Sequence, residues 1–320
     1  MLQAGIDIGY THTKAMTDGQ KSINFPSVVG TEYEVPFTLQ DDGHGIKFLT
    51  PQRAVIGDSA ITFSDLVTRR EDRNWIASED YYLLFLAALS ELEDNSGTAR
   101  VVTGLPLSYF EDRETLRERL QKVHTFQREG RSLQVINVEK VTVLPQPFGT
   151  LLDYCLDAQG KIIQSGTARS HIGVIDVGGK TTNFLHAYKL TEIPSETRSI
   201  SVGGWKAIKL LRRAVEHEYR DLVLHDHELI EAMISKNLRY QGKTIDITPL
   251  IETISEQLAR KIIGEASQLW ESLGKFSLIL LTGGGSLLLG EALTAYFPQA
   301  IRVEHPVFAN CRGFWKYAQR

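Results

Sequence analysis

Two short segments of the sequence place an aspartate in an apolar strand and follow it with glycine and small polar residues. The first, GIDIGYTHTK, begins at residue 5 and contains Asp7; the second, GVIDVGGKTTN, begins at residue 173 and contains Asp176. Glycine lets a backbone approach a ligand closely, and successive amides in a tight turn form a concave anion site. A single Asp-x-Gly is most often a structural turn. Its repetition favours two turns that hold a polyphosphate from both sides, with Lys14 adding positive charge.

The two aspartates would repel a phosphate chain unless a cation lies between them. Mg²⁺ binds oxygen ligands and keeps several of its waters. We therefore expect Asp7 and Asp176 to hold Mg²⁺, mainly through water. The alternative is that each aspartate only hydrogen-bonds a neighbouring turn.

A third glycine turn, LTGGGS, follows a buried strand at residues 281–286. Three consecutive glycines are costly to order, which suggests close approach to a flat group such as a nucleoside. A plain strand-to-helix turn is an equally good interpretation. Gln146, in VLPQPFGTLL, stands at a strand end, where a glutamine can orient a water for attack on a phosphate; most glutamines beside two prolines are ordinary loop residues. The segment HDHE at 225–228 lacks further ligands at suitable spacing, so it predicts a solvated helix start.

An α/β framework must position these segments, because strand and helix patterns alternate along most of the chain. SEDYYLLFLAALSELE has an N-cap serine and an acidic first turn, which predicts a helix from residue 78. The start of the chain reads as a β-meander and residues 30–75 as polar loops. The other long helical patterns cover residues 108–123, 202–238 and 249–273.

The length and composition of the chain are sufficient for a large hydrophobic core. The sequence has 320 residues, of which 42% are hydrophobic, and this fits about two domains. The net charge of -4 gives no indication of a basic surface for nucleic acid or membranes. Cys155 and Cys311 are too few for a disulfide framework or a zinc site. Neither a signal peptide nor an apolar run of ~20 residues is evident, so we expect a cytoplasmic, reduced protein.

In their order along the chain, these motifs resemble those of the actin superfamily, which also includes the ATPase domain of heat-shock chaperones and sugar kinases. GIDIGYTHTK resembles its first phosphate segment, GVIDVGGKTTN its second, and LTGGGS its adenosine segment. Within the superfamily the sequence is most similar to ParM-type plasmid-partitioning proteins and short archaeal relatives. Four further segments carry this similarity: INFPSVVG, VIGDSA, VVTGLPLSYF and the ending PVFANCRGFWKYA. The resemblance covers essentially the whole chain.

The resemblance implies a two-domain α/β fold of the actin-like ATPase type. It would be built from duplicated ribonuclease-H-like domains, with a nucleotide in the cleft between them. Domain I would comprise residues 1–152 and 303–320, with an outer lobe at about 30–75. Domain II would comprise residues 153–302, with an outer lobe at about 215–255.

The resemblance also implies roles for individual residues. Asp7 and Asp176 would organise Mg²⁺ and its waters, Lys14 would contact the phosphates, and Gln146 would place the attacking water. ATP, or GTP, would be the nucleotide. The residues implied in binding it are Gly9, Tyr10, Thr11, His12, Thr13, Gly178, Gly179, Lys180, Thr181, Gly203, Gly204, Glu256, Arg260, Gly283, Gly284, Gly285 and Ser286.

Two positions depart from the family pattern. Asn183 stands where the second phosphate segment usually has an acid, and Pro147 follows Gln146 where several partitioning proteins place a glutamate nearby. Both departures imply slow hydrolysis, or hydrolysis closer to that of conventional actin.

The function implied is that of a cytoskeletal ATPase that assembles into filaments on binding ATP and Mg²⁺ and disassembles after hydrolysis, for example to segregate a plasmid. Its partners would be further copies of itself, stacked head to tail, and a small DNA-binding adaptor protein. No direct nucleic-acid or membrane contact is expected. One alternative is a small-molecule kinase of the same fold, which would need a catalytic aspartate facing its substrate. Another is a regulator that binds ATP without useful turnover, which Asn183 keeps open.

Overall fold

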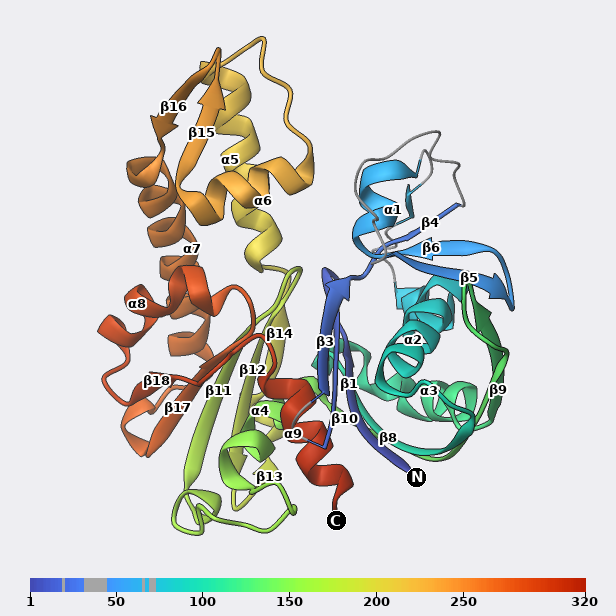
Figure 1. Ribbon diagram of the computed structural model, residues 1–320. Helices are drawn as coiled ribbons and strands as arrows, with labels where there is room; N and C mark the ends of the chain where they lie inside the picture. The colour runs from blue at the N-terminus through green and yellow to red at the C-terminus, as the bar shows by residue number, and fades with distance from the viewer. Residues whose placement is uncertain (19–20, 32–44, 65–66, 69–72) are drawn as a thin grey trace. The chain divides into compact units, whose positions relative to one another are not determined.

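Figure 1 shows the computed structural model, which describes residues 1–18, 21–31, 45–64, 67–68 and 73–320. The chain divides into two compact units: unit 1 comprises Met1–Ala168 and Phe308–Arg320, and unit 2 comprises Arg169–Val307. The expected boundary at residue 152 falls inside helix α4 (Gln146–Cys155). The chain stays with unit 1 beyond that helix, because the Ile163 amide donates to the Cys155 carbonyl at 2.9 Å. Part of the expected outer lobe at 30–75, residues 32–44, 65–66 and 69–72, lies outside the described residues.

Unit 1 is built on a mixed sheet in the order β3-β2-β1-β8-β10-β9-β5-β6-β4-β7. The central strands β1, β8 and β10 are parallel, and β2 returns antiparallel to β1, as the β-meander predicts. Nearly continuous apolar runs suit these strands, because both faces of their sheet are covered. The strands are β1 (Leu2–Ile8), β2 (His12–Thr17), β3 (Lys21–Pro26), β4 (Val29–Gly30), β5 (Ile46–Thr50), β6 (Ala54–Ile56), β7 (Val67–Thr68), β8 (Gly97–Leu105), β9 (Val123–Arg128) and β10 (Gln134–Pro145).

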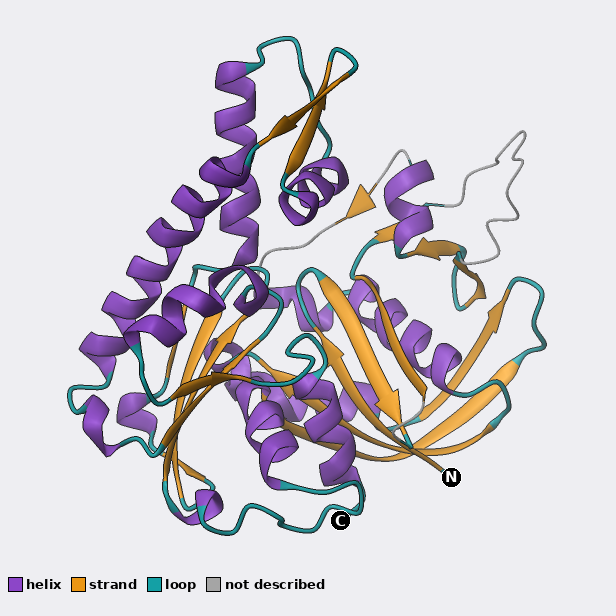
Figure 2. Ribbon diagram, turned by 60° about the vertical axis from the view of Figure 1, so that its left-hand side comes forward, coloured by secondary structure: helices purple, strands orange, loops and turns teal. Residues whose placement is uncertain are grey.

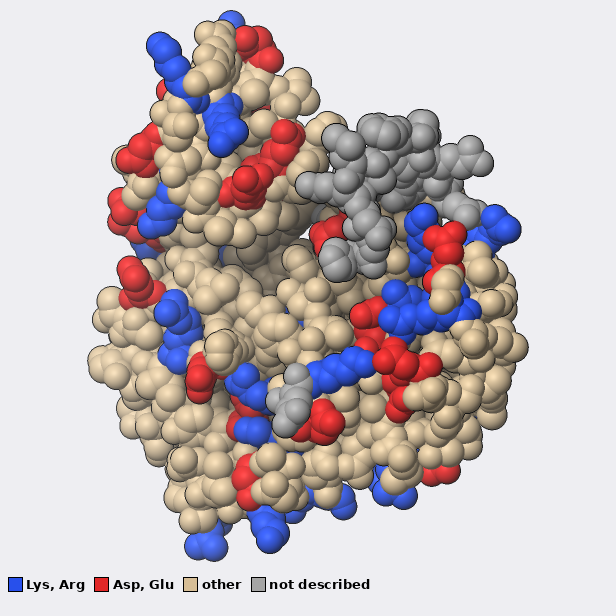
Figure 3. Space-filling model, viewed as in Figure 1, with Lys and Arg blue, Asp and Glu red and all other residues tan. Residues whose placement is uncertain are grey.

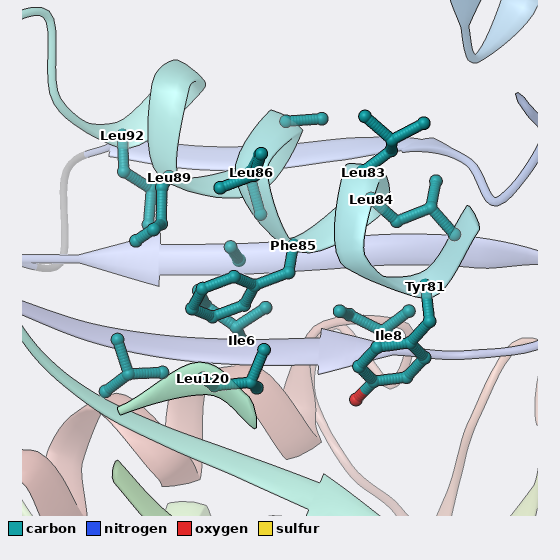
Figure 4. Packing of buried hydrophobic residues seen from close by; sticks show 14 of the residues in the cluster. Ile6, Ile8, Tyr81, Leu83, Leu84, Phe85, Leu86, Leu89, Leu92 and Leu120 are labelled. Atoms are coloured by element: carbon teal, nitrogen blue, oxygen red, sulfur yellow. The ribbon is translucent and has the colours of Figure 1, made fainter. Parts of the chain in front are cut away.

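Helix α2 (Glu79–Leu92) provides much of the core on one face of this sheet (Figure 4). It begins where the sequence predicts, because the Ser78 side chain accepts a hydrogen bond from the Tyr81 amide and caps the first turn. Fully burying a leucine or phenylalanine stabilises a fold by about 1.5–3 kcal/mol, and α2 buries several. The remaining helical segments of unit 1 are α1 (Asp58–Phe63), η1 (Arg73–Ala77), η2 (Leu107–Asp112), α3 (Arg113–Leu120), α4, η3 (Thr167–Arg169, which crosses the unit boundary) and α9 (Ala309–Ala318).

Helix α9 packs unusually close to its neighbours in unit 1. A Cβ at Gly5 of strand β1 would overlap the carbonyl of Cys311, and a Cβ at Gly149 of α4 would lie 2.6 Å from the carbonyl oxygen of Asn310. The Asp153 carboxylate on α4 also receives two hydrogen bonds from the Arg312 guanidinium, at 2.7 and 2.6 Å. Helix α9 therefore packs against both the strand that contains Asp7 and the helix that begins at Gln146.

Unit 2 has a second sheet in the order β13-β12-β11-β17-β18, with β14 paired to β12; Figure 1 labels its strands. Figure 2 shows the chain with its helices in purple and its strands in orange. The opening of unit 2 repeats that of unit 1: β12 returns antiparallel to β11, and β17 runs parallel to β11. Trp270 and Phe184 meet edge to face in its core. The elements are β11 (His171–Val177), β12 (Thr182–Tyr188), β13 (Thr191–Glu192), η4 (Pro194–Glu196), β14 (Arg198–Ile200), α5 (Gly204–Glu218), α6 (Asp226–Ser235), α7 (Thr248–Leu269), η5 (Leu273–Lys275), β17 (Leu278–Thr282), α8 (Ser286–Tyr296) and β18 (Ala300–Arg302).

The prediction of continuous helix over 202–238 was wrong. Helix α5 ends at Glu218, and a two-stranded sheet, β15 (Asn237–Tyr240) with β16 (Lys243–Asp246), lies between α6 and α7. Gln241 and Gly242 make its turn with φ angles of 48° and 76°. Two positive φ angles are the requirement of the tightest hairpin turns, but glutamine is a weak sequence signal for the first of them.

No helix in the described part of the chain is both long enough and apolar enough to cross a membrane.

Candidate functional site

In each unit an aspartate is the last-but-one residue of the first hairpin strand, and the following turn closes in the same way. In unit 1 the Gly9 amide donates to the His12 carbonyl at 3.0 Å; in unit 2 the Gly178 amide donates to the Thr181 carbonyl at 2.9 Å. The strand registers also match, since Asp7 lies opposite Lys14 and Asp176 lies opposite Asn183. The two motifs that the sequence singles out are therefore equivalent turns of a duplicated fold.

Asp7 is the centre of a polar cluster in unit 1. Its side chain is buried, and its two carboxylate oxygens have different partners: the Lys14 ammonium lies 3.3 Å from Oδ2, and the Gln146 amide nitrogen donates to Oδ1. A buried carboxylate needs such partners, because an unpaired charge away from water is very costly. The structure thus brings together three of the predicted residues, and they come from β1, β2 and the start of α4.

The contact with Asp7 fixes the orientation of the Gln146 amide. An amide oxygen facing the carboxylate would be repelled, so the nitrogen must face Asp7 and the Oε1 atom must point elsewhere. Gln146 can therefore accept a hydrogen bond from a water molecule through Oε1 while it remains held by Asp7. The predicted water-positioning role requires such an acceptor and stays a prediction.

The first turn is also held to the strand beyond it. The Ser27 amide donates to the Thr11 carbonyl at 2.9 Å, and the hydroxyls of Thr13 and Ser27 lie 2.9 Å apart. Thr13 is buried, whereas Gly9, Tyr10, Thr11 and His12 are partly exposed. The turn is thus a firmly held, accessible loop, and Thr13 supports it from beneath.

Three glycine segments of unit 2 converge on one another. The Gly204 amide donates to the Gly178 carbonyl at 2.9 Å, and the Trp205 amide donates to the Gly179 carbonyl at 2.8 Å. The Gly285 amide donates to the Val177 carbonyl, also at 2.9 Å. The backbone at the end of β11 and in the turn after it therefore hydrogen-bonds both the start of α5 and the loop before α8.

Only glycine fits at two of these positions. A Cβ at Gly203 would lie 2.5 Å from the Gly179 carbonyl oxygen. Gly283 has a φ of +81°, and its Cβ would lie 2.6 Å from an oxygen of Asp176. Gly284 lies between Gly283 and Gly285, but a Cβ at Gly284 would meet no atom within 4 Å. The buried Ser286 hydroxyl donates to the Gly283 carbonyl at 2.7 Å, so it shapes the loop.

Thr182 is a supporting residue that the sequence reasoning missed. Its buried hydroxyl donates to the Val202 carbonyl at 2.6 Å and so ties strand β12 to the segment before Gly203. A threonine inside a strand is common, because β-branched residues suit strands, so the sequence offered no signal. The neighbouring Asn183 is also buried and accepts a hydrogen bond from the Ser199 hydroxyl.

Glu256 and Arg260 lie apart from these contacts, on an exposed face of α7. The Arg260 guanidinium is 3.3 Å from the Glu256 carboxylate, one helical turn away. Such exposed pairs stabilise a helix only slightly. Their predicted place beside a nucleotide base stays a prediction, as does a ligand contact for Lys180, which is partly exposed at the second turn.

Asp7 and Asp176, one in each unit, carry the hard carboxylate oxygens that suit Mg²⁺. Among the described residues, no group of three or more His, Cys, Asp or Glu side chains could hold a metal by itself. A bound Mg²⁺ would therefore take most of its ligands from water and phosphate, as it does in nucleotide sites. The cysteines have no part in this chemistry, because burial raises the pKa of the Cys155 thiol to about 11 and that of Cys311 further.

Comparison with known proteins finds actin-like family matches in both halves of the chain. Residues 5–149 match the family described as "Actin like proteins N terminal domain", and residues 174–295 match "Archaeal actin homologue MreB-like, C-terminal". A relative from Thermoplasma volcanium, described as an archaeal actin homologue, is 28% identical over 340 residues, covering 100% of this chain and 99% of the relative.

Two solved structures share the fold along nearly the whole chain. An archaeal actin homologue superposes with a TM-score of 0.83 at 22% identity, covering 99% of both chains, and it has also been solved in complex with ADP. The subunit of a 15-stranded ParM filament from Clostridium botulinum superposes with a TM-score of 0.80 at 22% identity, covering 99% of this chain and 98% of that one.

Proposed function

We propose that this chain, which is an actin-like protein of the actin superfamily, binds a nucleoside triphosphate with Mg²⁺ and uses it to control assembly into head-to-tail filaments. The observation that carries the proposal is the convergence of the three glycine segments of unit 2, together with the equivalent turn at Asp7 in unit 1. Turns of this kind supply backbone amides to phosphate groups.

In this proposal the turns at 9–13 and 178–181 bind the phosphates, and the loop at 283–286 with Gly203 and Gly204 binds the nucleoside. Lys14 serves two groups, since it neutralises Asp7 at 3.3 Å and adds positive charge for a phosphate. ATP is the expected nucleotide, with GTP as the alternative. The archaeal homologue solved with ADP supports an adenine nucleotide.

Asp7 and Asp176 would hold Mg²⁺ through its waters. When bound, the ion neutralises charge on the phosphate oxygens. The role of the protein is then one of position: Gln146, anchored to Asp7, accepts a hydrogen bond from the attacking water through Oε1. Because Asn183 is neutral and already accepts from Ser199, it cannot act as a base, and we expect hydrolysis to be slow.

Filament formation is supported by the structural likeness to a ParM filament subunit. A head-to-tail contact uses two different surfaces of one chain, so it does not close on itself and builds a polymer. Hydrolysis would then loosen the polymer. The cargo we propose is DNA such as a plasmid. The filament would move it in the cytoplasm, through a small DNA-binding adaptor protein.

The second candidate is a regulator that binds ATP with little turnover. Asn183 favours it, because it replaces the acid that the family usually has opposite the aspartate. The two candidates agree on binding and differ in turnover and assembly.

Equilibrium binding of ATP, ADP and GTP, each with Mg²⁺ and with EDTA, tests the shared part of the proposal. We expect binding that weakens at least about tenfold, or ~1.4 kcal/mol, when EDTA removes the metal. No saturable binding of any nucleotide by a folded protein would overturn it. Phosphate release at saturating ATP then separates the ATPase from the regulator. A small-molecule kinase would instead transfer the γ-phosphoryl group to an added substrate and release ADP.

A further inference from the structure

An unusual polar feature of unit 1 lies in its interior rather than on its surface. On the face shown in Figure 3, the described Lys and Arg side chains are interspersed with Asp and Glu. Inside unit 1, the hydroxyl groups of Tyr81 on α2 and Thr103 on β8 have no hydrogen-bond partner among the described residues, and each residue is only 1% exposed. Folded proteins rarely leave a buried hydroxyl without a partner, because the loss of its hydration is costly.

The two hydroxyls lie near one another without making a direct hydrogen bond. Burial raises the pKa of Tyr81 well above its usual value, the Thr103 hydroxyl opposes that rise, and the charge of Asp7 adds to it. Thr103 is paired with Ile6, and paired residues of neighbouring strands point to the same face of a sheet, which here is the face that α2 covers. The Tyr81 hydroxyl points away from α2, beside Ile8 near the end of β1 (Figure 4). Both hydroxyls therefore lie close to the ends of β1 and β8.

The strands β1 and β8 separate at this point. Their parallel pairing ends at Ile6 and Thr103. Beyond that pair, β1 continues to Ile8 in contact with β2, and β8 continues to Leu105 in contact with β10. Asp7 directly follows Ile6 and so lies beyond the last pair of the β1–β8 ladder. At the level of Asp7, the sheet therefore does not join these two strands to each other.

Unit 2 contains the same junction in a closed form. The parallel pairing of β11 with β17 continues one residue further than its counterpart in unit 1, to Asp176 and Thr282. The position equivalent to Thr103 is Leu281, which is apolar and fully buried. The sheet itself therefore holds the strand at Asp176. The corresponding place in unit 1 has a hydroxyl instead of an apolar side chain and has no pairing with β8 at Asp7.

We infer that one internal water molecule binds between the ends of β1 and β8, where it bridges the hydroxyls of Tyr81 and Thr103. A water molecule accepts a hydrogen bond from one hydroxyl and donates to the other. Buried waters typically make about three hydrogen bonds to groups that otherwise lack a partner, and the main chain of the separated strand ends provides the third. The water links β1 to β8 at the level of Asp7, as the ladder itself does at Asp176.

This water makes Tyr81 and Thr103 positioning residues for Asp7. They act through the end of β1, since the Asp7 carboxylate itself is held by Lys14 and Gln146. A strand end that is linked on both sides moves less than one linked on a single side, and small displacements of a reacting group are costly in rate. This role rests on the proposed function, in which Asp7 holds Mg²⁺ through its waters, whereas the water site itself does not.

A high-resolution crystal structure tests the water site directly. We expect a density peak within hydrogen-bonding distance of both hydroxyl oxygens in the wild-type chain and no such peak in Thr103→Val. A wild-type structure without the peak would overturn the inference. So would an anomalous signal at this place in crystals soaked in rubidium, because it would show that the site binds a monovalent cation instead of water.

Urea unfolding gives an answer whose sign separates a bridged pair of hydroxyls from an unpaired one. Tyr81→Phe and Thr103→Val keep the shape of each side chain and remove its hydroxyl. With a bridging water, each change lowers the urea midpoint, and the double variant loses little more than the more affected single variant, because the first change already releases the water. If the hydroxyls have no partner, their removal raises the midpoint, and that result would contradict the inference.

Phosphate release tests the positioning role. Thr103→Val should lower phosphate release at saturating ATP about tenfold and change the affinity for ATP by less than about threefold. Thr103→Ser restores the hydroxyl and should regain most of the lost turnover. Unchanged turnover in Thr103→Val would overturn the positioning role and leave the proposed function standing. If the wild-type chain releases no phosphate, the proposed hydrolysis fails, and the density and the urea midpoints still decide the water site.

Discussion

At the residue scale, Asp7 and Asp176 are buried carboxylates near the ends of two otherwise apolar strands. The sequence identified both, because each is followed by glycine and the pattern occurs twice. It also identified Lys14 and Gln146, but their contact with Asp7 depends on strand register and on residues 139 positions apart. Pattern reasoning does not reach contacts at such a separation. Thr182 was missed because a threonine inside a strand is common and gives no local signal.

Asp176→Asn tests the role of the second aspartate. The amide keeps the size of the side chain but removes the charge that would hold the Mg²⁺ waters. Phosphate release should fall at least about tenfold, or ~1.4 kcal/mol in barrier, with the thermal midpoint of unfolding nearly unchanged. Unaltered turnover in a folded variant would remove Asp176 from the site.

Gln146→Ala separates water positioning from binding. The change removes the Oε1 acceptor and one partner of Asp7, while Lys14 continues to neutralise that carboxylate. We expect phosphate release at saturating ATP to fall by about tenfold to a hundredfold and the affinity for ATP to change by less than about threefold. The assignment fails if affinity falls and the turnover of bound ATP does not.

At the element scale, the sequence predicted the strands and glycine turns well but not how the turns meet. The capped helix α2 begins as expected, since caps and periodicity are local signals. The hairpin of β15 and β16 was missed because its turn is Gln-Gly. The convergence of the loops at 178–179, 203–204 and 283–285 was not predictable from local pattern, because tertiary packing of the sheet decides it.

Neighbouring glycines of one loop offer a sharp comparison at this scale. Gly283→Ala adds a methyl group in a positive-φ position against Asp176 and should destabilise the protein by about 2–4 kcal/mol. Gly284→Ala meets open space and should change stability by less than about 1 kcal/mol. Denaturant unfolding without nucleotide compares the two; equal losses would contradict the loop geometry.

The hairpin of β11 and β12 should carry a pH dependence at the end away from Asp176. His186 is buried among His171, Glu196 and Lys275, and burial lowers its pKa below the ordinary value of 6.5 despite the nearby Glu196. The unfolded chain then binds more protons between the two pKa values, so stability rises with pH through that window. It should therefore fall as the pH drops below about 6.5.

His186→Gln should flatten this part of the stability profile. Gln does not titrate, so the loss of unfolding free energy between pH 7.5 and pH 5.5 should be smaller in the variant than in the wild type, whatever its absolute stability. Urea midpoints at both pH values measure it. An identical loss in both proteins would show that His186 does not titrate in this range.

At the scale of the whole molecule, the fold is duplicated, and each unit has one aspartate and one glycine turn at equivalent positions. The family resemblance predicted the actin-like fold, and the comparisons confirm it along nearly the whole chain. Filament contacts were beyond the sequence, because they are formed by exposed surfaces with no periodic signal.

Sedimentation with electron microscopy tests the central claim most directly. The purified chain should be examined with Mg²⁺ and ATP, ADP or a non-hydrolysable ATP analogue, with phosphate release followed in parallel. The account predicts filaments with ATP and with the analogue, few or none with ADP, and longer-lived filaments with the analogue. A folded chain that binds ATP but remains monomeric with every nucleotide, even at high concentration, would contradict it.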